Sequence, residues 1–171
     1  MASNTLRTIL GFFRSVLERR FPGLRKQDSL AGVFNYVSVS ELVATSGQPD
    51  ETQLVQIANA GYGTVINLAP TSVIENSVVD ERGILENCGV TYIHIPVDFR
   101  NPTESEFRQF ISLMDERANE PVWVNCAANM RVSAFIYRYR CSVLGHDVEE
   151  AREDLQKIWE PFGVWKEFVA R

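Results

Sequence analysis

The spacing of apolar positions changes along the chain, from a helical pattern at the N-terminus to a mixture of strand and helix patterns. In residues 4–20 the apolar side chains recur three and four positions apart, which predicts one amphipathic helix with a largely basic polar face. Pro22 ends the pattern, and a linker is predicted after it. We therefore expect an N-terminal segment over residues 1–34 and one folded domain over residues 35–171.

Within the domain, short apolar runs alternate with amphipathic stretches that begin at capping residues. Strands are predicted at 36–40, 42–45, 64–68, 90–97 and 122–124. Capping pairs such as Thr103 with Glu106 mark helix starts. The helices are predicted over 51–60, 78–88, a stretch from 104, 131–143, a stretch from 148, and a last one that starts at Pro161.

This alternation predicts an α/β fold with three α-β-α layers. The central sheet should be mostly parallel, with about four to five strands and helices on both faces. Ligands of such sheets bind at the carboxyl ends of the strands. Candidate functional residues therefore lie in 69–75, 98–101 and 125–131.

Composition limits the classes of protein that fit. The 171 residues are 45% hydrophobic and 23% charged, as expected for one globular domain, and the net charge of −5 does not favour a nucleic-acid partner. No apolar run is long enough to span a bilayer, and no secretory signal pattern is present, so we expect a cytoplasmic protein. The three cysteines are widely spaced and the two histidines are not clustered with them, so neither a disulfide framework nor a metal site is predicted.

The charge is unevenly distributed. Residues 1–26 hold six basic groups and one acidic group, a net +5, and the remaining residues therefore carry −10. A basic segment on an acidic body indicates a separate role for the N-terminal helix. Because short helices of this kind dock on protein more often than on lipid, we expect contact with the domain or with a partner subunit, and a membrane-surface role is the alternative. The oligomeric state stays open.

The segment after the last predicted strand combines features that bind anions. Cys126 follows an apolar strand, small residues come next, and a helix begins at Arg131. A helix N-terminus presents unpaired N–H groups and the positive end of the helix dipole, which together bind phosphate or sulfate and favour a thiolate. An arginine adds bidentate contacts to a tetrahedral oxyanion. The alternative is an inert, buried cysteine, which is how we interpret Cys88 and Cys141.

The other residues of this segment are candidates for substrate binding. Ala127 and Ala128 are small enough to let the backbone wrap closely around an anion, and Ser133 could donate to the cysteine sulfur. Asn129 and Met130 complete the lining of the loop. None of these side chains indicates which substrate is bound.

Several short motifs follow one another along the chain: Tyr36-Val37-Ser38, Ser46-Gly47-Gln48-Pro49, Ile66-Asn67-Leu68, the stretch from Gly89 to Val97, and the Cys126 segment. Together they resemble a bacterial family of dual-specificity-type phosphatases, related to a phosphatase-like domain found beside some β-lactamase-fold hydrolases. The resemblance covers roughly residues 35–160. It implies the cysteine-phosphatase fold, hydrolysis of a phosphorylated small molecule or phosphoprotein through a phosphocysteine, and no metal or other cofactor.

The resemblance also implies roles for individual residues. Cys126 is then the nucleophile and Arg131 holds the phosphate. Asp98 follows the strand at 90–97 and is the best candidate for the general acid. Glu104 and Glu106 are reserve candidates, but carboxylates in the first turn of a helix usually serve the helix itself.

The segment departs from the usual His-Cys-x5-Arg-Ser/Thr signature at three positions. Asn125 replaces the histidine, Asn129 stands where a glycine is expected, and Arg131 comes one residue early, which gives Cys-x4-Arg. One residue is about 100° of helix rotation, so the guanidinium cannot hold the same phosphate unless the loop is rebuilt. Whether the loop is a competent catalyst therefore stays open, and weak or absent activity is an alternative expectation.

Two other functions fit part of this pattern. A catalytically dead phosphatase-like module would bind a phosphorylated ligand without turnover. Rhodanese-type sulfurtransferases resemble the Cys-x4-Arg spacing, but they continue with a strand and a Gly-Gly turn, whereas Gly145 here leads directly into helices. Sulfur transfer is therefore the less favoured of the two enzymatic functions.

Overall fold

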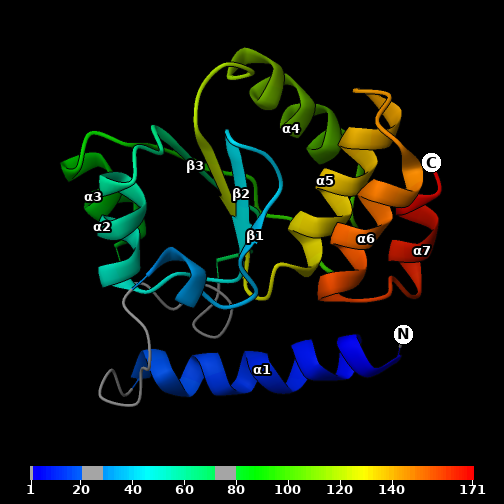
Figure 1. Ribbon diagram of the computed structural model, residues 1–171, viewed down its shortest axis with the longest axis horizontal. Helices are drawn as coiled ribbons and strands as arrows, with labels where there is room; N and C mark the ends of the chain where they lie inside the picture. The colour runs from blue at the N-terminus through cyan, green and yellow to red at the C-terminus, as the bar shows by residue number, and fades with distance from the viewer. Residues whose placement is uncertain (1, 21–28, 72–79) are drawn as a thin grey trace.

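The computed structural model describes residues 2–20, 29–71 and 80–171 of the chain (Figure 1). Its centre is one five-stranded sheet with the strand order β1-β2-β5-β3-β4. Neighbouring strands are parallel throughout, except for β1, which pairs antiparallel with β2. The strands are β1 (Val37–Ser38), β2 (Val43–Ser46), β3 (Thr64–Asn67), β4 (Thr91–His94) and β5 (Val122–Asn125).

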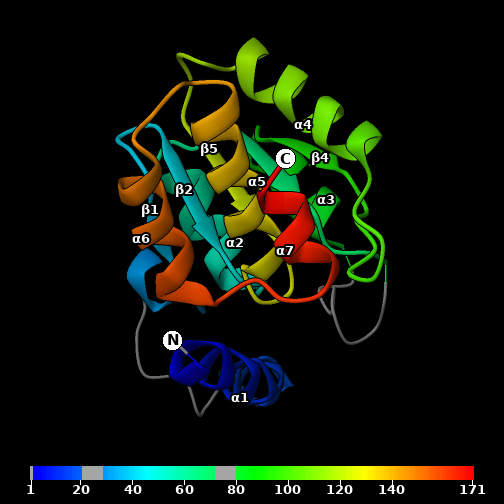
Figure 2. The ribbon, with the colours of Figure 1, turned by 90° about the vertical axis from the view of Figure 1, so that its right-hand side faces the viewer.

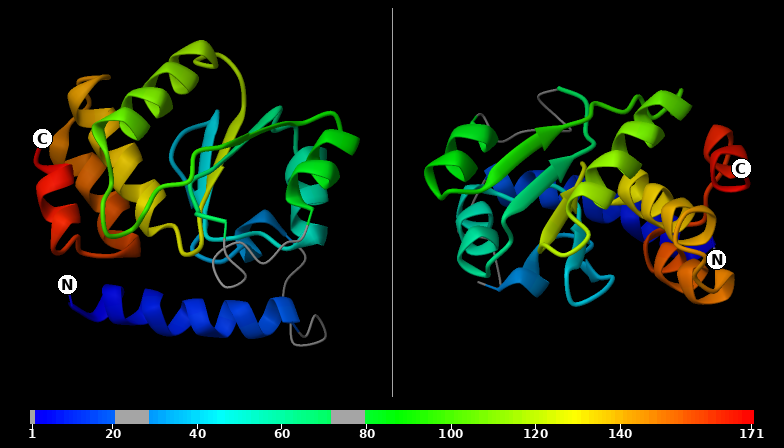
Figure 3. Two further views of the ribbon diagram at one scale, coloured as in Figure 1. Left: turned by 180° about the vertical axis from the view of Figure 1, so that it is seen from behind. Right: turned by 90° about the horizontal axis from the view of Figure 1, so that it is seen from above.

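Helices cover both faces of this sheet, as the alternating pattern predicts. Helices α2 and α3 lie on one face and α4 to α7 lie on the other (Figure 3). The predicted α/β fold with a mostly parallel sheet is therefore confirmed. The helical elements are α1 (Ala2–Arg20), a 3-10 turn η2 (Leu30–Gly32), α2 (Glu51–Asn59), α3 (Glu81–Asn87), α4 (Glu104–Glu116), α5 (Met130–Ser142), α6 (Val148–Ile158) and α7 (Val164–Val169).

Two predicted boundaries need comment. The last helix begins at Val164 and not at Pro161, because Gly163 has a positive φ of 55° that a right-handed helix cannot contain. The predicted linker is structured at its end, since Leu30–Gly32 form η2 and Val33 is buried beside α2. Residues 21–28 of that linker and residues 72–79 of the predicted loop and helix start lie outside the described residues.

Alternation along the central strands divides the core into two halves. Trp123 of β5 and Val65 of β3 face α2 and α3. Their neighbours Val124 and Ile66 face α4 and α5, where the aromatic side chains of the C-terminal helices gather. Each central strand is buried on both faces, which explains why it appears in the sequence as a continuous apolar run.

Helix α1 lies across the carboxyl-end edge of the sheet (Figures 1 and 2). Polar bonds attach it to the end of α6: Asn4 donates to the carbonyl of Gln156 at 2.9 Å, and Thr8 donates to the carbonyl of Ile158 at 2.5 Å. The expectation that the helix contacts the domain is met, but the contact uses the side that carries Asn4, Thr8 and Phe12 and leaves the predicted apolar side exposed. No helix in the described part of the chain is long and apolar enough to cross a membrane.

Candidate active site

The carboxyl ends of four strands meet along one edge and bring polar residues together. Asn125 ends β5 and pairs in register with Ser46 of β2 on one side and Asn67 of β3 on the other. Asn67 in turn pairs with His94 of β4. The segments that follow these strands therefore start side by side, and one of them begins with Cys126.

The Cys126 loop (residues 126–129) makes a tight turn from β5 into α5. Cys126 is buried, with only 1% of its surface exposed, and α5 begins at Met130. Asn129 has a left-handed backbone with φ of 64°, which explains why glycine is expected there. Asparagine tolerates this conformation better than most residues with a side chain.

The side chain of Asn129 also attaches the turn to two neighbouring segments. Its Nδ2 donates to the carbonyl of Asn35 at 2.7 Å and to the hydroxyl of Thr45 at 3.0 Å. A glycine could make neither bond. Asn129 therefore combines the backbone freedom of the expected glycine with two hydrogen bonds, and in the structure its side chain holds the loop in place.

The carbonyl groups of the loop point toward neighbouring segments. Ala127 accepts from the amide of Gln48 at 3.3 Å, and Ala128 accepts from Nδ2 of Asn35 at 3.0 Å. In residues 2–20, 29–71 and 80–171, no acceptor takes a hydrogen bond from the amides of Ala127, Ala128 or Met130. Amides presented in this way at a helix N-terminus are the arrangement that binds phosphate.

Arg131 lies in the first turn of α5 and is only 4% exposed. Its guanidinium carbon lies 5.2 Å from the ring centroid of Phe99. Phe99 is held in turn by Trp165, whose indole N–H donates to the Phe99 carbonyl at 2.8 Å. The fold therefore brings Arg131 against the loop that carries Asp98.

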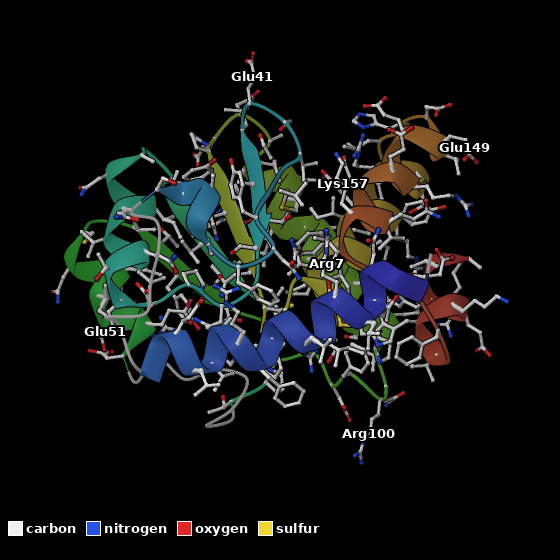
Figure 4. The ribbon with its side chains drawn as sticks, turned by 60° about the horizontal axis from the view of Figure 1, so that its bottom comes forward. Arg7, Glu41, Glu51, Arg100, Glu149 and Lys157 are labelled. Atoms are coloured by element: carbon white, nitrogen blue, oxygen red, sulfur yellow. The ribbon has the colours of Figure 1, made fainter. Side chains whose placement is uncertain are left out.

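Asp98 itself is exposed on that loop. Its Oδ1 accepts from the amide of Arg100 at 2.9 Å, a short-range bond that orders the turn. Figure 4 shows Arg100 projecting away from the body of the molecule. Asp98 is adjacent in sequence to Phe99, which contacts Arg131, but among the described residues no contact of its own connects Asp98 with Cys126.

The hydroxyl of Ser133 is engaged away from the cysteine. It donates to the carbonyl of Met130 at 3.1 Å and accepts from the indole N–H of Trp159 at 3.1 Å. These bonds join the first turn of α5 to the end of α6. In the described structure Ser133 therefore connects the first turn of α5 with Trp159, and the predicted hydrogen bond from Ser133 to the sulfur of Cys126 is not among its contacts.

A buried polar network lies beside the loop at the end of β5. Glu81 is only 3% exposed and accepts from Asn67 at 2.7 Å, from the hydroxyl of Tyr92 at 3.2 Å and from Asn125 at 3.3 Å. Burial raises the pKa of Glu81, and the side-chain donors lower it only in part. Burial and the neighbouring Glu81 also raise the pKa of Tyr92, which keeps its hydroxyl a donor.

This network explains what occupies the place of the expected histidine. Asn125 is fully buried and directed to Glu81. The side chain that precedes the cysteine is therefore held by a carboxylate, and it cannot become cationic. Its role is to position the start of the Cys126 loop.

The reserve acids have structural roles. Glu106 accepts from the amide of Thr103 at 2.7 Å and completes the predicted capping box. Glu104 receives a bidentate pair of bonds from Arg138 at 2.8 and 2.9 Å, and these bonds, together with Arg171, lower its pKa to about 2. Both carboxylates therefore serve the fold, as their helix positions indicate.

The remaining ionisable groups of the described residues are dispersed. Among the residues that the structure describes, no three His, Cys, Asp or Glu side chains gather as metal ligands. Cys88 is exposed, so the interpretation of it as a buried cysteine is wrong: it follows the last turn of α3 at the surface. Burial raises the pKa of Cys141. Neither cysteine shares the environment of Cys126.

Sequence reasoning missed several residues that shape the site. Glu81, Phe99, Trp159 and Asn35 lie in separate segments, and no motif connects them with Cys126. A polar residue at the end of a buried apolar strand indicates a site at the carboxyl edge of the sheet, and this pattern in the sequence points to Asn67. The remaining contacts depend on which strands are neighbours.

The comparisons with known proteins agree on one type of domain. A family model, PTP-NADK, described as a DSP-PTPase phosphatase fused to NAD+ kinase, matches residues 32–163. A beta-lactamase hydrolase-like protein of Xylella fastidiosa (strain Temecula1 / ATCC 700964) is 30% identical over 76 residues, which are 43% of this chain and 18% of that protein. The chain therefore corresponds to a small part of that relative.

Solved structures share the fold over most of the chain. A DUF442 protein from Shewanella putrefaciens CN-32 is 28% identical, with a TM-score of 0.71 over 82% of this chain and 92% of its own. The core catalytic domain of the PP-IP phosphatase SIW14 from S. cerevisiae is 12% identical, with a TM-score of 0.67 over 81% of this chain and 85% of its own. The second likeness concerns the fold alone.

Proposed function

The chain belongs to the PTP-NADK family of DSP-PTPase phosphatase domains, and from this premise we propose that it hydrolyses phosphomonoesters through a phosphocysteine on Cys126. The observation that carries the proposal is the geometry of the Cys126 loop. A left-handed Asn129 turns the chain so that the amides of Ala127, Ala128 and Met130 have no protein acceptor in the described residues, at the start of the helix that carries Arg131. Such amides and a guanidinium are complementary to a phosphate.

The proposed reaction has two steps. The thiolate of Cys126 attacks phosphorus, the S–P bond forms, and the bond from phosphorus to the substrate oxygen breaks while Asp98 gives its proton to that oxygen. The Asp98 carboxylate then takes a proton from water, the resulting hydroxide attacks phosphorus, and the S–P bond breaks. Inorganic phosphate and the free thiolate are the products.

Arg131 and the loop amides would stabilise the charge that develops on the three outer phosphate oxygens. With the Cys-x4-Arg spacing, Arg131 lies in the first turn of α5, immediately behind the Cys126 loop, and this position supports the role. Cation–π contact with Phe99 restricts the guanidinium on the side of the Asp98 loop. The substrate class stays at a phosphorylated small molecule or a phosphoprotein.

A competing proposal is a binding module that holds a phosphorylated ligand without turnover. It is favoured by Asn125, since a neutral side chain that is directed to Glu81 does less for a thiolate than a cationic histidine would. Such a module would still bind the phosphate group of its ligand but would not hydrolyse the phosphomonoester. Activity and binding therefore have to be measured separately.

Hydrolysis of para-nitrophenyl phosphate tests the enzyme directly. The nucleophile variant Cys126→Ser should lose at least about a thousandfold in kcat/KM, and Cys88→Ser, at an exposed cysteine, should keep wild-type activity. Acid quenching during turnover followed by mass spectrometry should detect one phosphoryl group on the peptide that contains Cys126. Equal activity of wild type and Cys126→Ser would refute the proposal.

Phosphate binding separates the remaining possibilities. Inorganic phosphate should raise the melting temperature of the wild type, and Arg131→Ala should abolish that rise. A rise without turnover would identify the binding module. Transfer of sulfur from thiosulfate to Cys126, without hydrolysis of the aryl phosphate, would instead identify a sulfurtransferase.

A further inference from the structure

Helix α1 is attached to the domain by its polar side. Besides Asn4 and Thr8, Arg7 donates to the carbonyl of Lys157 at 2.8 Å, and Thr5 accepts from the amide of Glu160 at 2.9 Å. Figure 4 shows Arg7 and Lys157 on neighbouring parts of α1 and α6. Phe12 also packs against the core of the domain. The stripe of apolar residues on the other side of the helix faces outward.

The outward side is a continuous apolar stripe. Five large side chains three, four or seven positions apart form it, so they share one helix face, which we call the outer stripe. Their exposed fractions of 40–61% are high for residues of this type. The outer stripe consists of Leu6 (58%), Ile9 (40%), Leu10 (61%), Phe13 (61%) and Leu17 (54%).

Basic side chains accompany the outer stripe. Arg7 and Arg14 lie seven residues apart on one flank of α1, between the attached side and the outer stripe, and both are exposed. The bond from Arg7 to the Lys157 carbonyl does not neutralise its charge. Arg14 is ion-paired with Glu18 at 2.7 Å, and an exposed pair of this kind is weak in water. The segment 1–26 carries +5, whereas the rest of the chain carries −10. An apolar face beside basic side chains is the composition of helices that lie in the interface of anionic bilayers.

We propose that the outer stripe of α1 is a docking surface for an anionic lipid bilayer. The stripe exposes on the order of 500 Å² of apolar surface, less than the roughly 800 Å² that each partner buries in a stable protein interface. Antiparallel pairing of two copies of α1 would also bring the arginines of one helix toward those of the other, which is unfavourable. A bilayer meets neither objection, because it matches any length of apolar stripe and its anionic headgroups pair with the arginines.

Docking would also orient the site. Asn35 connects α1 with the Cys126 loop, since its Nδ2 donates both to the hydroxyl of Thr8 at 3.3 Å and to the carbonyl of Ala128 at 3.0 Å. A bilayer under α1 therefore lies on the same side of the molecule as the carboxyl-end edge of the sheet (Figure 1). The docking proposal itself depends on α1 alone and holds whether or not Cys126 is a nucleophile.

Flotation of the full chain with vesicles tests the proposal. Vesicles of phosphatidylcholine with about one third phosphatidylglycerol should bind the protein, and pure phosphatidylcholine vesicles should bind it several-fold less. The double variant Leu10→Ser with Phe13→Ser should lower the partition coefficient at least about tenfold. Leu144→Ser, at an exposed leucine beyond α5, should bind like the wild type.

Charge and self-association provide two further measurements. Arg14→Gln should reduce binding to the anionic vesicles about threefold or more and leave the little binding to pure phosphatidylcholine unchanged. Sedimentation without lipid should show the same oligomeric state for the wild type and the double variant. Circular dichroism and the melting temperature verify that each variant is folded, which we expect because the substituted side chains are exposed.

Several outcomes would overturn the proposal. Failure of the folded wild type to float with anionic vesicles would do so. So would unchanged flotation of the double variant. A dimer that the double variant dissociates, without vesicle binding, would assign the outer stripe to a second copy of the chain. Phosphatase activity is not a readout of this test, so its loss or retention bears only on the proposed reaction.

Discussion

Asn129 offers the sharpest test of how the Cys126 loop is built. The residue combines a left-handed backbone with φ of 64° and two side-chain donations, to the carbonyl of Asn35 and to the hydroxyl of Thr45. Asn129→Gly removes the bonds and keeps the backbone conformation accessible. Asn129→Ala removes the same bonds and also makes the conformation unfavourable. The pair of variants therefore separates the two contributions.

The expected magnitudes follow from these contacts. Each lost hydrogen bond costs about 0.5–1.5 kcal/mol net, and an alanine in the left-handed region costs about 1–2 kcal/mol more than a residue that tolerates it. Asn129→Ala should therefore lower the free energy of unfolding by about 2–5 kcal/mol. Asn129→Gly should be destabilised about 1 kcal/mol less, since glycine avoids the backbone strain but gains freedom in the unfolded chain.

Guanidinium unfolding followed by tryptophan fluorescence measures these differences, because Trp123 and Trp159 are fully buried. Asn87→Ala is the matched control, since Asn87 is exposed and the change should stay within about 0.5 kcal/mol. Phosphate should still raise the melting temperature of the glycine variant, and it should do so less for the alanine variant. Equal destabilisation by both substitutions, or an alanine variant as stable as the wild type, would refute this reasoning.

Three further predictions concern groups around the site. Arg138 lowers the pKa of Glu104 to about 2, so the contribution of this carboxylate to stability is present above its ordinary pKa of 4.5 and is lost as pH falls toward 2. In urea unfolding measured against pH, the advantage of the wild type over Glu104→Gln should shrink over that window, and a constant difference would contradict this prediction. Burial raises the pKa of Glu81, so its contribution to the free energy of unfolding is present below pH 4.5 and is lost as pH rises through the pKa of the folded state. Glu81→Gln should remove this loss of stability with rising pH, and an unchanged pH profile of stability would argue against the prediction. A Cβ at Gly47 would lie 2.7 Å from the ring of Phe34, so Gly47→Ala should lower the free energy of unfolding by about 1–3 kcal/mol and weaken the phosphate-induced rise in melting temperature. A melting curve like that of the wild type would show that the segment can move aside.

Local patterns predicted most of the secondary structure. The capping box of Thr103 with Glu106 forms as expected, and the apolar run that precedes Cys126 is a buried strand. These features depend on neighbouring residues, so they can be recognised in the sequence. The last helix is the exception, because the positive φ of Gly163 delays its start.

The orientation of α1 shows where a pattern is insufficient. The spacing of its apolar residues predicts an amphipathic helix, and the structure confirms it. The pattern favours an apolar face buried on protein, yet Asn4, Thr8 and Phe12 make contacts with the domain, and Leu10 and Phe13 are exposed. Periodicity identifies two faces of a helix, but it does not state which of them the rest of the chain will meet.

The sequence by itself determined the α/β class, the parallel sheet and the place of the Cys126 loop, because each depends on alternation, capping and the position of one residue after one strand. Only the tertiary structure decided what surrounds that cysteine. The strand order places Asn67 and Ser46 beside Asn125, buries Glu81 among them, and brings Phe99 to Arg131. Strand order is set by the packing of the whole core, so residues distant in the sequence become neighbours in ways that no local pattern contains.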